Sequence, residues 1–210
     1  MKKFFMTCPF QPAGSLRPQH YEAVDNARLR YEKETRFPLI QLLNSYAEDD
    51  EQVEVYVVKA DYKNAEENYK LFEEELEALK AKKHLDCTPV PITVPYDDSL
   101  DTQLKIFEEL ITRTADSDTL YGCITYGSKP MPMVMMMAFN YAHRFHKDVT
   151  IDCMVYGKFD HDSHKAQIYD ITSLLYMDEI TRLMAEQKVS DPMRHIRKLL
   201  DLDSREEAQP

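Results

Sequence analysis

The sequence predicts an α/β fold: a Rossmann-like three-layer sandwich on a mainly parallel sheet, with a C-terminal antiparallel hairpin and a short helical tail. The main evidence is that strand-like runs of β-branched and aromatic residues alternate with amphipathic helical segments along most of the chain. Composition agrees, because 210 residues with 43% hydrophobic side chains are enough to bury one core. We therefore expect one domain over residues 1–187, followed by a short helix and a disordered tail over 188–210.

The first half of the chain is expected to form two strands and three helical segments. Prolines and a glycine over residues 9–18 indicate a loop after the first strand. Pro38 suits the first turn of a helix, and the clearest helix repeats apolar residues every three or four positions. In chain order we expect a strand at 3–8, a helical segment at 20–35, a helix from Pro38, a strand at 53–58 and a helix at 64–83.

The second half continues the alternation and ends in a hairpin. The prolines of residues 89–94 favour an edge strand. Asp97-Asp98-Ser99 offers caps for a helix with apolar residues on one side, namely Leu100, Leu104, Phe107 and Leu110. The other expected elements are strands at 119–125, 149–156 and 167–171, helices at about 130–145, 173–187 and 193–202, and a disordered tail from Asp203.

Charge and cysteine usage narrow the class of protein. A net charge of −11 argues against binding to duplex nucleic acid, which depends on many Lys and Arg side chains. No apolar run approaches the ~20 residues of a membrane-spanning helix. The four cysteines form no C-x-x-C pair, which favours buried thiols in a reducing compartment, namely Cys8, Cys87, Cys123 and Cys153. We expect a cytoplasmic protein without a membrane segment.

One segment, Thr125-Tyr126-Gly127-Ser128-Lys129-Pro130, combines features of an anion-binding turn. A strand runs into a glycine, which allows a ligand to approach closely, and a helix follows. The N–H groups of Ser128, Lys129 and Met131, the helix dipole and the Lys129 ammonium all favour a negative charge. The segment is neither G-x-x-x-x-G-K-[ST] nor G-x-G-x-x-G. Spacing alone leaves an anion site and an ordinary strand–helix connection equally open.

The expected fold brings a second loop to the same place. Ligands of open α/β sheets bind outside the carboxyl ends of the strands. The loop after the first strand, Thr7 to Gln11, and the loop after Thr125 both meet this requirement. Tyr62, Tyr96 and Tyr126 also follow strands and are candidates to line that edge.

The helix expected at 130–145 has almost no polar side before Asn140, which predicts burial on all sides. One side can pack on the sheet. A two-fold dimer interface is the simplest cover for the other side. The alternative is burial beneath residues 20–46.

The segment Ile124-Thr-Tyr-Gly-Ser-Lys-Pro-Met-Pro132 resembles the ligand-binding turn of CARF domains, the CRISPR-associated Rossmann fold family. In that turn a strand ends in Thr. A Gly follows, then a Thr or Ser, then a Lys or Arg, and then a buried helix. The segment Tyr169 to Glu179, after a hairpin, is similar to the end of such domains. The resemblance extends over residues 1–187.

The resemblance implies a sensor of type III CRISPR systems that binds cyclic oligoadenylate, with cyclic tetra-adenylate favoured, across a homodimer formed through helix 130–145. It implies no metal and no cofactor. Phe10 is a candidate to stack on adenine. The residues that the resemblance places at the ligand are Thr7, Cys8, Pro9, Phe10, Gln11, Thr125, Gly127, Ser128 and Lys129. Tyr126, which lies within the loop, and Met131, through its backbone N–H, are added as candidates from the sequence itself.

Three alternatives stay open. A metal-independent ring nuclease would let a ribose 2′-OH attack the adjacent phosphate, with Lys129 and Ser128 stabilising the transition state. The loop holds no histidine, so we rank binding above cleavage. A fragment of a longer effector and a nucleotide-binding α/β scaffold outside CRISPR systems are the others. A metal-hydrolase cluster at Asp160-His161-Asp162-Ser163-His164 is disfavoured, because these positions suit a solvated hairpin turn.

Overall fold

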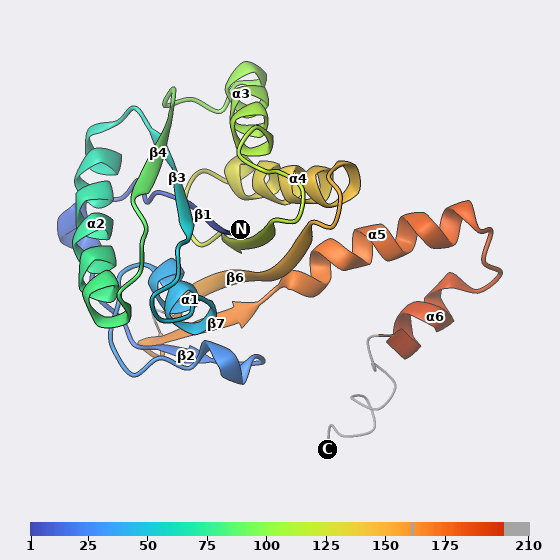
Figure 1. The fold of residues 1–210 in the computed structure, drawn as a ribbon, viewed down its shortest axis with the longest axis horizontal. Helices are drawn as coiled ribbons and strands as arrows, with labels where there is room; N and C mark the ends of the chain where they lie inside the picture. Colours follow the sequence, from blue (N-terminus) through green and yellow to red (C-terminus); the bar gives the residue numbers. More distant parts are fainter. Residues whose placement is uncertain (161, 200–210) are drawn as a thin grey trace. The chain divides into compact units, whose positions relative to one another are not determined.

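The computed structural model describes residues 1–160 and 162–199. The chain divides into two compact units, one of residues 1–172 and one that begins at Ser173. The first unit holds a seven-stranded sheet with helices on both faces, which confirms the predicted α/β class (Figure 1).

Five parallel strands form the body of the sheet, in the order β4-β3-β1-β5-β6. They are β1 (Lys2–Thr7), β3 (Glu54–Ala60), β4 (Pro89–Val94), β5 (Thr119–Cys123) and β6 (Thr150–Asp160). The proline-bearing strand β4 lies at one edge, as predicted. The antiparallel hairpin is also confirmed, because β7 (Lys165–Asp170) runs back along β6.

Strand order places a topological switch point beside β1. After β1 the chain forms β2 at the far edge beside β7, continues to β3 and β4 on one side of β1, and then crosses back to β5 on the other side. The loops after β1 and β5 therefore leave the sheet in diverging directions at adjacent positions. This is where open α/β sheets bind their ligands.

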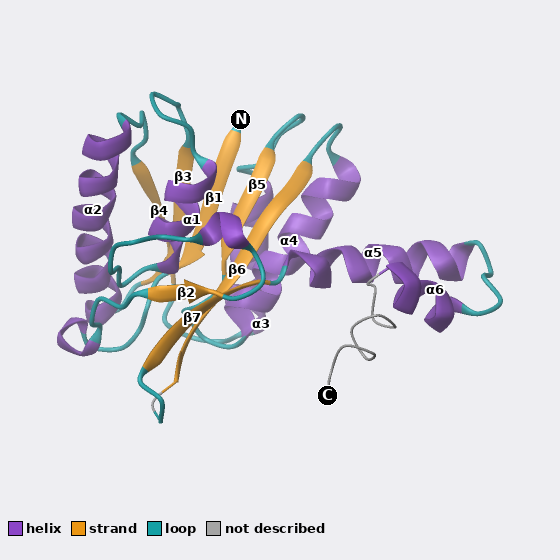
Figure 2. Cartoon of the chain, turned by 90° about the horizontal axis from the view of Figure 1, so that it is seen from below, coloured by secondary structure: helices purple, strands orange, loops and turns teal. Residues whose placement is uncertain are grey.

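The two aromatic residues of β1 show how the layers are built. Successive residues of a strand point to opposite faces. Phe4 stacks on Tyr121 at 4.4 Å, next to Tyr46, whereas Phe5 meets Phe139 edge to face at 5.3 Å on the other face. Helices α1 (Pro38–Tyr46) and α2 (Lys63–Lys83) cover the first face, and α3 (Leu100–Ile111) and α4 (Pro130–Phe145) cover the second (Figure 2).

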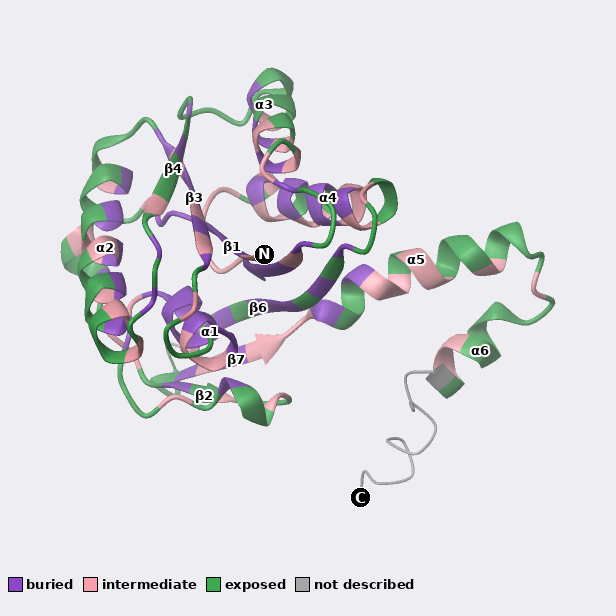
Figure 3. Ribbon diagram, viewed as in Figure 1, coloured by how far each residue is buried: buried purple, intermediate pink, exposed green. Residues whose placement is uncertain are grey.

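Helix α2 confirms the periodicity read from the sequence. One side is buried against the sheet and the other is exposed and charged (Figure 3). The buried apolar residues are those of the predicted repeat: Ala65, Tyr69, Phe72, Leu76 and Leu79.

The predicted helix at 20–35 is wrong. Residues Tyr21–Ala23 form a short strand, β2, which pairs in parallel with β7, and Ala27–Leu29 form a single 3₁₀ turn. Asn26 caps this turn by accepting a hydrogen bond from the backbone N–H of Arg28 at 3.0 Å. Pairing with the sheet edge therefore outweighed a helical composition in which Tyr21, Val24, Ala27 and Tyr31 recur every three or four residues.

The prediction that helix 130–145 is buried on all sides is also wrong for a single chain. Met133, Met137 and Phe145 are 65%, 61% and 72% exposed. In α3 the buried residues are Thr102, Ile106 and Leu110, and two of the leucines expected on its packed side, Leu100 and Leu104, are exposed. The alternative cover, residues 20–46, lies on the opposite face of the sheet with α1 (Figure 2).

The second unit contains α5 (Thr172–Glu186) and α6 (Pro192–Leu199), in agreement with two predicted helices. The end of the second predicted helix and the tail from Asp203 lie outside the described residues. No helix in the described ranges has the length and apolar character to cross a membrane. All four cysteines are free and buried, as predicted.

A buried ion pair fixes β1 at the amino end of the sheet. Asp118 lies 2.9 Å from the ammonium of Lys3 and 3.5 Å from the N-terminal amine of Met1. Asp118 also accepts a hydrogen bond from the backbone N–H of Ala115 at 2.7 Å, and Lys3 donates to the carbonyl of Arg113 at 2.7 Å. Both charged side chains are largely removed from water, and Asp118 is the buried partner of Lys3, whereas its second partner, Glu54 at 3.2 Å, is more exposed.

Replacing Asp118→Asn is expected to lower the free energy of unfolding by about 3 kcal/mol, because Lys3 would keep a buried charge without its main partner. Urea unfolding followed by circular dichroism measures the change. The control is Asp148→Asn at an exposed position, which is expected to change stability by less than about 0.5 kcal/mol. Equal effects of the two substitutions would contradict a special role for the buried pair.

Candidate functional site

Helix α2 holds the loop after β1. The side-chain amide of Asn68 donates to the carbonyls of Pro9 and Gln11 at 3.0 and 2.8 Å, and that of Asn64 donates to the carbonyl of Phe10 at 3.1 Å. Two side-chain amides of α2 therefore fix three consecutive loop residues through the backbone carbonyls of the loop alone. The side chains of Phe10 and Gln11 are left free to line a site.

Cys8, which begins this loop, points into the protein. Its thiol is buried and donates to the carbonyl of Ala65 at 3.2 Å. Burial raises the pKa of Cys8 to about 12. The thiol is therefore protonated at neutral pH and unsuited to act as a nucleophile.

The two predicted loops meet directly. The hydroxyl of Thr7, at the end of β1, donates a hydrogen bond to the backbone carbonyl of Tyr126 in the loop after β5. Gly127 then adopts φ +93°, and a side chain on it would lie 3.0 Å from the Cβ of Thr7 and 3.1 Å from the sulfur of Met131. Only glycine combines this backbone conformation with so close a neighbour.

Thr125 and Tyr126 fasten the loop to its surroundings. The hydroxyl of Thr125 accepts from the backbone N–H of Gly157 at 2.9 Å, and the hydroxyl of Tyr126 donates to the carbonyl of Arg36 at 2.6 Å. Burial raises the pKa of Tyr126, and the neighbouring hydroxyl of Tyr21 raises it further. Tyr126 is therefore a neutral hydrogen-bond donor at physiological pH.

The start of α4 offers fewer donors than the sequence suggested. The backbone N–H of Met131 donates to the carbonyl of Ser128 at 3.1 Å and is not available to a ligand, which corrects its predicted role. The hydroxyl oxygen of Ser128 is buried and has no partner within residues 1–160 and 162–199. Lys129 is exposed at the first turn of the helix.

A first hollow, of about 290 Å³, lies on one side of this loop. We call it the Tyr96 hollow; its lining residues are Phe10, Pro95, Tyr96, Asp97, Asp98, Ser128 and Met131. Tyr96 packs edge to face on Phe10 at 5.4 Å and stacks on Tyr62 at 4.3 Å. Hydrogen bonds from Ser99 lower the pKa of Asp97, so that carboxylate is charged at neutral pH.

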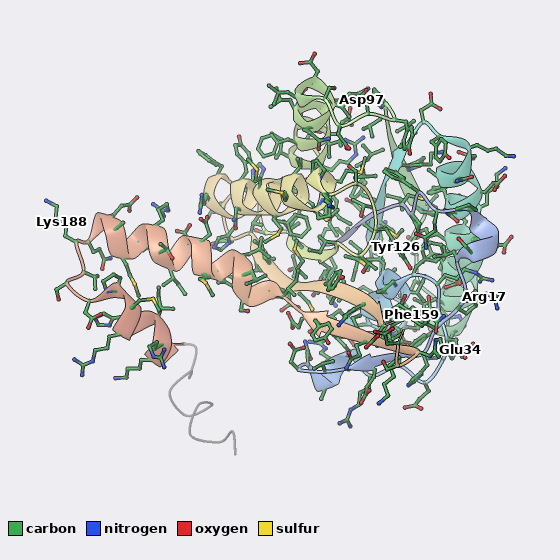
Figure 4. All side chains as sticks on the ribbon, turned by 180° about the vertical axis from the view of Figure 1, so that it is seen from behind. Arg17, Glu34, Asp97, Tyr126, Phe159 and Lys188 are labelled. Carbon is green, nitrogen blue, oxygen red and sulfur yellow. The ribbon has the colours of Figure 1, made fainter. Side chains whose placement is uncertain are left out.

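A second hollow, of about 370 Å³, lies on the other side of the loop. We call it the Arg17 hollow; its lining residues are Gln11, Ser15, Leu16, Arg17, Gln19, Tyr21, Thr125, Tyr126, Gly157 and Phe159. Figure 4 labels Tyr126 between Asp97 of the Tyr96 hollow and the pair Arg17 and Phe159 of the Arg17 hollow.

The predicted site residues divide between the two hollows. Phe10, Ser128 and Met131 line the Tyr96 hollow, whereas Gln11, Thr125 and Tyr126 line the Arg17 hollow. Thr7 and Gly127 form the contact between the loops. The other predicted residues, Cys8, Pro9 and Lys129, are not part of either lining.

Sequence reasoning missed Arg17, Gln19 and Phe159. Arg17 and Gln19 flank a proline in the segment after β1, and they enter the site only because this segment folds back over the sheet edge. Phe159 comes from the end of a strand that was predicted to stop earlier. Arg17 could have been predicted as a site residue, because it is a cationic residue in the loop that follows the first strand.

The carboxylate of Asp160 organises the acidic hairpin turn. The carboxylate of Asp160 accepts from the backbone N–H groups of Asp162 and Ser163 at 2.9 and 3.4 Å. His161 lies outside the described residues. Among the described residues, no three His, Cys, Asp or Glu side chains are grouped to hold a metal ion.

Gly127→Ala is expected to destabilise the protein by about 1–3 kcal/mol, because it places a non-glycine residue at positive φ against Thr7. Gly14→Ala is the matched control, since nothing lies within 4 Å of its new Cβ. We expect the control to change stability by less than about 1 kcal/mol. Chemical denaturation of both variants measures the difference, and a neutral Gly127→Ala would refute the close approach.

The comparisons with known proteins yield no family for this chain. No model of a protein family matches the sequence, and no curated protein matches it. The geometry of the sheet edge is therefore the basis on which a function is proposed.

Proposed function

We propose that the protein is a sensor of type III CRISPR systems that binds cyclic oligoadenylate, with cyclic tetra-adenylate as the favoured ligand. The observation that carries the proposal is the meeting of the loops after β1 and β5 at the switch point, through Thr7 and Tyr126. Hollows with aromatic and hydrogen-bonding side chains flank this contact on both sides. Such surfaces suit nucleotides, whose bases stack and whose riboses and phosphates accept or donate hydrogen bonds.

The first turn of α4 supports phosphate binding. The positive end of a 16-residue helix dipole lies there, beside the Lys129 ammonium. The unpartnered hydroxyl of Ser128 adds a donor next to it. A phosphodiester of the ring would satisfy Ser128 and Lys129 together.

A homodimer is the second part of the proposal. Met133, Met137, Tyr141 and Phe145 follow one another at intervals of four along α4, and Tyr141 stacks on Phe145 at 4.5 Å. Leu100 and Leu104 of α3, which packs on α4, are exposed as well, and we call these six residues the α3–α4 face. An exposed apolar surface of this kind favours a partner. A second copy paired through α4 would place two Lys129 side chains around one shared ring, which matches the symmetry of a cyclic ligand.

Binding is favoured over cleavage at this edge. Attack by a ribose 2′-OH needs a group to accept its proton. Residues 124–132 contain no histidine, and Tyr126 has a raised pKa and already donates to Arg36. Lys129 and Ser128 are suited to hold a phosphate in the ground state. Cleavage would be detected as linear products when the titrated mixtures are separated by chromatography.

Lys129→Ala is expected to abolish measurable binding of cyclic tetra-adenylate. Each subunit would lose a charge-assisted hydrogen bond worth about 1.5–3 kcal/mol. Because one ring contacts both subunits of the dimer, its binding free energy would lose two such contributions. Calorimetric titration compares the wild type with this variant and with Lys147→Ala, an exposed lysine beyond the other end of α4.

Lys147→Ala should retain wild-type affinity. Chromatography of the titrated mixtures, with cyclic hexa-adenylate run in parallel, reports ring size and any linear products. Unchanged affinity in Lys129→Ala would remove Lys129 from the site, and failure of the wild type to bind either ring would overturn the proposed function.

Met137→Glu is expected to convert the dimer into a monomer, because it buries a charge in the centre of an apolar interface and weakens association on the order of a hundredfold. Light scattering after gel filtration measures the mass, which should fall from twice 24.7 kDa to 24.7 kDa. Val24→Glu, at an exposed apolar residue outside the α3–α4 face, is the control. A wild type that stays monomeric with saturating ligand would contradict the dimer.

A further inference from the structure

The two hollows beside the β5 loop carry opposite charge. Among the described residues that line the Arg17 hollow, Arg17 is the one charged side chain. In the Tyr96 hollow the charged lining residues are Asp97 and Asp98. Arg17 therefore attracts an anion to its hollow, whereas Asp97 and Asp98 weaken the attraction that Lys129 exerts on a phosphate at the other side of the loop.

The segment that carries Arg17 is anchored, although Arg17 itself is exposed. The guanidinium of Arg36 donates to the carbonyl of Leu16 at 3.0 Å and pairs with Glu75 of α2 at 2.9 Å. Gln19 exchanges two backbone hydrogen bonds with Thr35, both 2.9 Å long. The backbone on both sides of Arg17 is thus fixed to Arg36 and Thr35, which in turn bind Glu75 of α2, and this places Arg17 beside the hollow with an ordered main chain.

The remaining lining suits a nucleoside. Phe159 offers an aromatic face for a base, and the amides of Gln11 and Gln19 can both donate and accept hydrogen bonds. Arginine presents a planar fork of donors that matches the oxygens of a phosphate. The volume, about 370 Å³, falls in the range of roughly 300–1,000 Å³ typical of small-ligand sites.

We propose that the Arg17 hollow binds one nucleoside monophosphate unit, with its phosphate on the guanidinium of Arg17 and its base against Phe159. In the protein as a sensor, this unit is one nucleotide of the ring, so the inference deepens the proposed function and rests on it for the identity of the physiological ligand. Arg17 then discriminates a phosphorylated nucleoside from an unphosphorylated one. Lys129 holds a phosphate at the other side of the loop, at the start of α4.

The test uses adenosine 5′-monophosphate and adenosine as probes, together with cyclic tetra-adenylate. Calorimetric titrations compare the wild type with Arg17→Gln and with Arg30→Gln, an exposed arginine outside both linings. We expect Arg17→Gln to weaken adenosine monophosphate binding at least tenfold and adenosine binding less than twofold. Arg30→Gln should leave both affinities unchanged, and thermal unfolding should show that both variants are folded.

A second substitution tests the base. Phe159→Leu is expected to weaken adenosine and adenosine monophosphate binding by the same factor, since it removes a stacking surface and leaves the phosphate contact intact. If Phe159→Leu does not fold, the Arg17→Gln comparison alone decides. Equal losses of adenosine and its monophosphate in Arg17→Gln would overturn the inference, as would a wild type that does not bind the monophosphate at millimolar concentration.

The outcomes separate this inference from the proposed function. Wild-type affinity of Arg17→Gln for cyclic tetra-adenylate would overturn the inference and leave the sensor function standing. Arg17-dependent binding of adenosine monophosphate without binding of either cyclic ring would support the inference and overturn the sensor function. It would identify a nucleotide-binding protein that does not sense cyclic oligoadenylate.

Discussion

The central position of β1 is the constraint on which the rest of the structure depends. β1 pairs in parallel with β3 on one side and β5 on the other. Its own residues Phe4 and Phe5 are buried on opposite faces of the sheet. Because β1 and β5 are adjacent parallel strands, the loops that follow them begin side by side at the carboxyl edge of the sheet. The contact between Thr7 and Tyr126, the left-handed conformation of Gly127 and the two hollows all follow from that arrangement.

An acidic protein can still offer an anion site if its charges are placed unevenly. The carboxylates that line the two hollows belong to Asp97 and Asp98, which precede α3, whereas Arg17 lines the other hollow and Lys129 precedes α4. The net charge of −11 therefore disfavours non-specific contact with nucleic acid while a small anion finds local partners.

Much of the fold could be predicted from the sequence, because its strands and helices have strong local patterns. The apolar repeat of α2, the prolines of β4 and the hairpin of β6 and β7 each specify their own structure. The segment around Tyr21 could not be predicted, since its strand exists only through pairing with β7, which lies more than 140 residues away in the sequence. The predicted loops did come together, but Arg17 and Phe159 complete the site through long-range folding that no local pattern reports.

Arg36 joins three parts of the molecule through one residue. Its carbonyl receives the hydroxyl of Tyr126, and its side chain binds both Glu75 of α2 and the carbonyl of Leu16. The β5 loop, helix α2 and the segment that carries Arg17 therefore cannot shift independently without breaking one of these bonds. A displacement of Tyr126 would therefore act through Arg36 on both Glu75 of α2 and the backbone beside Arg17.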